Sequence, residues 1–135
     1  ALRYFCDEDI RQFAIEKLRR TNCPAVYLPL LISNYREGDH LLLAEIAARH
    51  KNVDTVHALA CEYIDIYRAN KTPECREPLE LLYEKLNCGM HRADLLEVLQ
   101  DNGVLSDRLL REMAFDSYEG VRDLHEKFTG MGLHP

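Results

Sequence analysis

The sequence predicts an all-α fold, and three observations lead to that prediction. Apolar residues recur with the 3.6-residue period of an amphipathic helix, a cap or stop residue stands at nearly every boundary, and no alternating apolar–polar pattern lasts long enough for a strand. The 135 residues, 47% hydrophobic and 30% charged, suit one domain with a substantial core. We expect residues 1–135 to form a single domain, a compact antiparallel bundle of six core helices with additional N- and C-terminal helices.

Two helices are expected near the N-terminus. Asp7 can cap a helix that runs to about Arg20, because aspartate is favoured at the N-cap. The next helix is expected over about 28–35, because Pro29 is tolerated in the first turn of a helix but breaks its interior. A short strand over 25–28 is the alternative for its beginning.

The middle of the chain predicts two helices with marked apolar faces. Asp39 can cap a helix to about His50, and Asn52 can cap a longer one over 53–69. Apolar side chains share one side of the longer helix, and we expect six to be buried: Val56, Leu59, Ala60, Tyr63, Ile64 and Tyr67.

Four further helices are expected in the C-terminal half. Thr72 followed by Pro73 marks the start of the fifth helix, with threonine at the N-cap and proline at the first helical position, and Gly89 marks its end. A sixth helix is expected over about 91–100. The remaining caps are Ser106 for the seventh helix and Asp116, with Glu119 three residues on, for the eighth. Short connections make consecutive helices antiparallel, and no internal period is evident, so we expect a bundle and not a repeat array.

Composition excludes several classes of function. The net charge of −6 argues against a DNA- or RNA-binding protein, which usually carries a basic face. No apolar run approaches the roughly 20 residues of a membrane span, so we expect no membrane association. Five irregularly spaced cysteines make a poor disulfide framework and favour a reducing compartment, which predicts a cytoplasmic protein.

A search for catalytic motifs predicts no enzyme and no cofactor. The sequence has no Gly-x-Ser-x-Gly nucleophile motif, and no cysteine stands in a known catalytic signature. Its six glycines stand singly, so no glycine-rich phosphate-binding loop is formed.

One group of histidines and cysteines has spacing that suits a metal. His57 and Cys61 stand four residues apart on one helix, and Cys88-x-x-His91 spans a turn between helices, with Cys75 also nearby in sequence. No Cys-x-x-Cys knuckle accompanies them, and the same side chains can pack between helices without a ligand. We therefore expect no metal site, with zinc binding as the alternative.

Three stretches carry a resemblance to a known superfamily. They are DHLLLAEIAARH at 39–50, NVDTVHALACEY at 52–63 and RADLLEVLQDNG at 92–103. Together with the helix from Pro73 and the segment 106–114, they resemble the death-fold superfamily of signalling adaptors, with a candidate core over 24–115. The chain lacks the tryptophan usual in death domains, and Arg92-Ala-Asp-Leu95 is similar instead to a motif of death-effector domains.

The resemblance implies a six-helix antiparallel bundle that associates with like domains through oppositely charged helix faces, as in apoptosis signalling. The partners it implies are other proteins. The exposed charged residues of the second and third family helices become the candidate contacts: Glu45, Arg49, Lys51, Asp54 and Glu62.

A second interpretation is a fragment of a helical-repeat scaffold. Residues 6–19 are similar to a unit of HEAT-like or lipid-kinase helical domains. Such a scaffold also binds proteins, but along an open surface. Helix topology distinguishes the two interpretations: a Greek-key bundle supports the adaptor, and successive parallel hairpins support the repeat.

Overall fold

The computed structural model describes residues 2–130, and every regular element in that range is helical. The α-helices are α1 (Glu8–Arg20), α2 (His40–Arg49), α3 (Val53–Ala69), α4 (Arg76–Tyr83), α5 (Gly89–Asp101), α6 (Asp107–Met113) and α7 (Glu119–Thr129). Short 3-10 helices are η1 (Leu2–Tyr4), η2 (Pro24–Val26), η3 (Leu28–Leu31) and η4 (Pro73–Cys75). The all-α prediction is confirmed. Among these helices, none combines the length and apolar character needed to cross a membrane.

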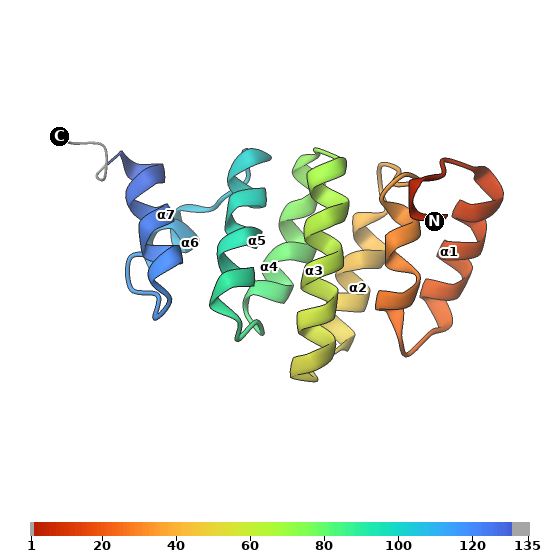
Figure 1. Cartoon of the computed structure of the whole chain (residues 1–135), viewed down its shortest axis with the longest axis horizontal. Coiled ribbons are helices and arrows are strands. Elements are labelled where there is room, and N and C mark those ends of the chain that lie inside the picture. Colours follow the sequence, from red (N-terminus) through yellow and green to blue (C-terminus); the bar gives the residue numbers. More distant parts are fainter. Residues whose placement is uncertain (1, 131–135) are drawn as a thin grey trace.

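The helices form a row, with α1 at one end and α7 at the other (Figure 1). The row has two layers: α3, α5 and α7 lie nearer the viewer in Figure 1, and α2, α4 and α6 lie behind them. Contacts follow the row, since α2 packs against α4, α3 against α5, and α5 against α7. The expected six-helix antiparallel bundle is not confirmed, because its helices would surround one shared core and its end helices would meet.

Neighbouring helices within a layer run parallel. His40, at the start of α2, has its Nδ1 3.3 Å from a carboxylate oxygen of Glu74, just before α4. At the opposite ends, the Lys85 ammonium group donates to the carbonyls of Ala47 and His50, at 2.6 and 3.0 Å. Lys85 therefore supplies donors to carbonyls that the end of α2 leaves without helical partners. Successive helical hairpins are stacked in the same direction, as in a repeat array.

The stacked hairpins have a regular period. Each unit consists of two successive elements: α1 with η3, α2 with α3, α4 with α5, and α6 with α7. The units begin after Asp7, Asp39, Thr72 and Ser106, which stand 32, 33 and 34 residues apart. The expectation of no internal period is therefore wrong. The period is hidden because the second element of each unit varies from the four residues of η3 to the 17 of α3.

Three asparagines mark the ends of the first three units. The side-chain amides of Asn34, Asn70 and Asn102 each donate to the carbonyl four residues earlier, at 2.8–2.9 Å. Two of these asparagines also close their own unit, because Asn34 accepts from the backbone N–H of Asp7 and Asn102 from that of Thr72, at 2.9 and 2.8 Å. The third links two units, since Asn70 also donates to a carbonyl at the end of η3. Each bond satisfies a backbone group that a helix end or loop leaves open.

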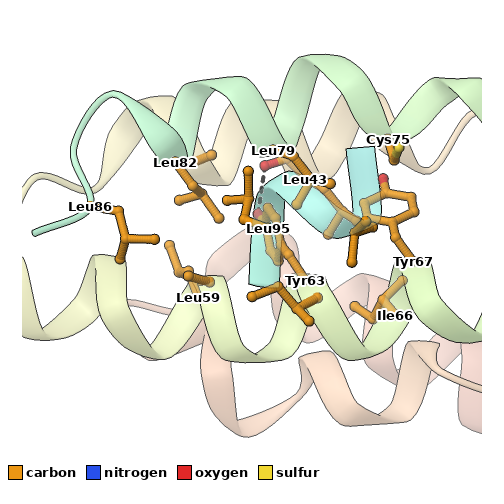
Figure 2. Close-up of a cluster of buried hydrophobic side chains, with 14 of the residues drawn as sticks. Leu43, Leu59, Tyr63, Ile66, Tyr67, Cys75, Leu79, Leu82, Leu86 and Leu95 are labelled. Carbon is orange, nitrogen blue, oxygen red and sulfur yellow. Dashed lines mark hydrogen bonds between the residues drawn. The ribbon is translucent and has the colours of Figure 1, made fainter. Parts of the chain in front are cut away.

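The core lies between the two layers and is continuous along the row. Figure 2 shows its centre, where side chains of α2, α3, α4 and α5 meet. Tyr63 is fully buried there, and its hydroxyl donates to the Leu43 carbonyl at 2.6 Å. The six apolar side chains expected to be buried on the helix over 53–69 all have at most 3% exposure, so that prediction is confirmed.

Three helix starts and one helix end differ from the sequence prediction. Asp39 precedes α2, but its side chain makes no capping bond, because Arg11 and the Arg36 backbone N–H bind its carboxylate. Gly89 does not end the fifth helix, because α4 ends at Tyr83 and Gly89 is the first residue of α5.

The helix expected over 28–35 is only the 3-10 turn η3, with Pro29 in its first turn. Asp116 does not cap α7, which begins at Glu119 after Tyr118. The Asp116 carboxylate instead accepts from Arg92 of α5 and from the backbone N–H of Tyr118, which precedes the helix.

Candidate protein-binding face

The first helices of successive units expose a continuous outward surface with two adjoining hollows. The first, of about 550 Å³, lies between α1 and α2 and has an apolar floor of Ile15, Leu41 and Leu42. Leu41 is 64% exposed, so a large apolar side chain of this hollow is open to a partner. Charged residues border this floor: Arg11, Arg19, Asp39 and Glu45.

The second hollow, of about 460 Å³, lies along α4. It adjoins the first at the start of α2, where His40 lines it beside Gly38 and Leu41 of the first hollow. Four glutamates dominate its lining: Glu74, Glu77, Glu80 and Glu84. Arg76 and Arg108 supply the opposing charges.

Most of these carboxylates are already engaged within the protein. Glu80 pairs with Arg76 at 3.2 Å, and Glu84 pairs with Arg108 at 2.8 Å. Glu74 accepts the backbone N–H of Gly38 with both oxygens. Glu77 is exposed and has no ion pair within residues 2–130. It is therefore the carboxylate of this hollow that is open to a partner's positive charge.

The five predicted contact residues lie in two different layers. Glu45 and Arg49 are exposed on α2, with their charged atoms 4.0 Å apart, and Glu45 borders the first hollow. Lys51 and Asp54 are exposed at the turn into α3. Glu62 lies along α3 and is only partly exposed, and burial together with the charge of Asp65 raises the pKa of its carboxyl. The structure therefore brings the first two together but does not place all five on one surface.

The histidines and cysteines considered as zinc ligands are brought together, with one exception. Cys88 Sγ lies 3.0 Å from Nδ1 of His91, and Cys61 Sγ lies 3.3 Å from Nε2 of the same ring. The ring of His57 stands edge-on to that of His91, with 4.3 Å between the centroids. Cys75 is not part of this group: it is fully buried beside Tyr67, at the far end of α4 from Leu86 (Figure 2). Helical spacing identifies the two pairs, and the helix start at Thr72-Pro73 already places Cys75 at the opposite end of that helix from Cys88.

No family model, no curated protein and no solved structure matches this chain.

Proposed function

We propose that the chain is a non-enzymatic protein-interaction module that binds a partner along the outward surface of α1, α2 and α4. The observation that carries this proposal is the pair of adjoining hollows, which combine an exposed apolar floor at Leu41 with a charged border. Protein interfaces have this anatomy, with an apolar centre that excludes water and a polar rim.

The row of stacked hairpins favours the scaffold interpretation over a compact adaptor. Stacked helical repeats expose extended surfaces and commonly use them to bind other proteins. The spacing of 32–34 residues between unit starts is shorter than the roughly 40–47 of HEAT units and close to the roughly 33–34 of ankyrin and tetratricopeptide units. The scaffold is therefore proposed as a short-period array and not as a HEAT-like one.

The charge of the surface indicates the kind of partner. The chain carries a net charge of −6, and Glu77 and Glu45 are exposed beside the two hollows. A partner segment with an apolar anchor for the hollow at Leu41 and a lysine or arginine for Glu77 would match both. Such rim charges mainly raise the association rate and make it sensitive to salt.

The proposal is tested with surface variants and a purified partner. Leu41→Asp combined with Glu77→Lys should abolish co-purification of a partner that the unaltered chain retains. Asp123→Lys, an exposed change on α7 in the other layer, is the matched control and should retain it. Affinity measured between the purified partner and each purified variant should likewise be lost in the double variant and kept in Asp123→Lys. Equal binding by both variants would exclude this surface.

A second candidate is homotypic association of a cytoplasmic signalling adaptor through the charges of α2 and the following turn. It is supported by the exposure of Glu45, Arg49, Lys51 and Asp54. Arg49→Glu combined with Asp54→Lys should then reduce self-association measured by sedimentation. If the chain is a monomer at all concentrations, this candidate is excluded while the scaffold proposal stands.

A further inference from the structure

A stripe of metal-binding residue types runs along one side of α3. Asp54, His57 and Cys61 stand three and four residues apart, a spacing that places side chains on one face of a helix. This face meets the start of α5, where Cys88 and His91 stand. Two neighbouring units therefore contribute to one cluster.

The cluster is close to the dimensions of a zinc site. One donor atom each from His57, Cys88 and His91 can be chosen so that all lie within 4.8 Å of one another. Zinc bonds of about 2.0–2.1 Å to nitrogen and 2.3 Å to sulfur in a tetrahedron require donor separations of about 3.3–3.8 Å. Cys88 Sγ and His91 Nδ1, at 3.0 Å, are already near this range. The donor atom of His57 lies within 4.8 Å of the other two and has to move closer when the ion binds.

Arg92 holds the two residues before Cys88 in place. Arg92 donates from Nη1 to the carbonyls of Leu86 and Asn87, at 3.2 and 2.9 Å. The same guanidinium donates to the Asp116 carboxylate through Nε and Nη2. Both residues before Cys88 are therefore fixed by one side chain, so little ordering is needed when a ligand binds there.

The cluster is open to solvent on one side. A hollow of about 380 Å³ is lined by His57 and Cys88 together with Val53, Asp54, Leu86 and Asn87. An ion can enter by this route, and a water molecule from the hollow can complete the coordination. Asp54 lines the hollow but is not among the residues whose donor atoms lie within 4.8 Å of one another. Among the described residues that line the hollow, Asp54 carries a formal negative charge, which favours a cation there.

We propose that His57, Cys88 and His91 bind a zinc ion, with a fourth coordination position that faces this hollow. Two imidazoles and a thiolate suit zinc better than the hard cations Ca²⁺ or Mg²⁺, which take oxygen ligands. His91 binds the ion through Nδ1, and its Nε2–H donates to Cys61 Sγ, now 3.3 Å away. Cys61 thereby fixes the tautomer and orientation of a ligand without binding the metal. The Cys88 thiol releases its proton to solvent on binding.

The experiment uses the purified full chain, stripped of metal with a chelator and kept reduced. Titration with Co²⁺, followed by displacement with Zn²⁺, should give one equivalent with a thiolate-to-cobalt charge-transfer band and intense visible bands of tetrahedral cobalt. Cys88→Ser should remove the charge-transfer band, and His57→Gln should weaken binding by more than the roughly 10–100-fold typical of outer-shell changes. Cys61→Ser should keep the band and weaken binding within that range.

Cys23→Ser is the matched control, because Cys23 is an exposed free thiol outside the cluster. It should bind as the unaltered chain does, and far-UV circular dichroism should show each variant folded without metal. Failure to bind one equivalent overturns the proposal. So does a charge-transfer band that survives Cys88→Ser, or one that is lost equally in Cys23→Ser. Loss of the band in Cys61→Ser would overturn the assigned ligand set. None of these readouts requires a protein partner, so the result is independent of the proposed function.

Discussion

Replacing Asp116 by alanine removes one half of the ion pair between α5 and the segment before α7. Arg92 donates to the two Asp116 carboxylate oxygens from Nε and Nη2, at 2.9 and 2.6 Å. The side chains are only 14% and 8% exposed, so the pair is largely shielded from water. Bidentate ion pairs of this geometry are stronger than hydrogen bonds between neutral groups. We therefore expect the loss of this pair to lower the free energy of unfolding measurably.

The expected loss in the free energy of unfolding depends on the hydrogen bonds that Arg92 keeps after the substitution. Breaking a buried ion pair on one side typically costs about 3–5 kcal/mol, because the other charge is left uncompensated. Arg92 keeps its two backbone carbonyl acceptors, which offset part of that cost. We therefore expect Asp116→Ala to lower the free energy of unfolding by about 2–3 kcal/mol.

Urea unfolding at pH 7 measures the effect, in a double-mutant cycle with Arg92→Ala. The two losses should be strongly non-additive, because each variant removes the same pair. Glu16→Ala is the control: its pair with Arg20 is 3.8 Å long between side chains that are 64% and 80% exposed. That change should cost less than about 1 kcal/mol. The reasoning is refuted if Asp116→Ala costs no more than Glu16→Ala, or if the cycle is additive.

The ion pair between Arg92 and Asp116 also predicts how the free energy of unfolding changes with pH. Burial alone would raise the pKa of Asp116, but hydrogen bonds from Arg92 and from the Tyr118 backbone N–H outweigh it and hold the pKa below its ordinary value of 3.8. A carboxyl with a depressed folded-state pKa stabilises above its unfolded pKa and loses that contribution as the pH falls through the folded pKa. The stability difference between the unaltered chain and Asp116→Ala should be constant near neutrality and shrink below about pH 4.

Three further changes have distinct expected outcomes. Tyr63→Phe removes the buried hydroxyl that donates to the Leu43 carbonyl and should cost about 1–2 kcal/mol in urea unfolding, without change in the far-UV spectrum. Gly38→Ala should cost about 1–2 kcal/mol through backbone strain alone, because φ is +94° while the space around the added Cβ is open. Burial raises the pKa of the Cys75 thiol to about 12, so a disulfide reagent should modify Cys75 only after unfolding, whereas exposed Cys23 should react at once.

Local signals in the sequence predict the helices well. Asp7, Asn52, Thr72 and Ser106 each accept a backbone N–H at the start of the helix they were expected to cap. Capping and amphipathic periodicity depend on residues within one or two turns, so they can be recognised in one sequence. Asp116 does not cap α7, because the helix begins only at Glu119 and the carboxylate is shared between Arg92, 24 positions away, and the Tyr118 N–H. Asp39 makes no capping bond, because Arg11, 28 positions away, binds its carboxylate.

The arrangement of the helices could not be predicted in this way. Unit starts 32–34 residues apart are hard to recognise when the second helices differ so much in length. The asparagines at the unit ends share only a hydrogen bond to the carbonyl four residues earlier, and their bonds to distant residues depend on how the helices pack. For the candidate sites, spacing along α3 identified His57 with Cys61, whereas the hollow at Leu41 depends on α1 packing beside α2 and has no signal in the sequence.

The row of hairpins also determines how the chain would respond to force. Each hairpin contacts mainly its immediate neighbours, so tension applied at α1 and α7 loads the joints between units in series. Such a chain extends as the interfaces between neighbouring units separate one at a time. Hairpins that stay folded can form these interfaces again when the force falls. An ion held between α3 and α5 would cross one of these joints and make it the last to open.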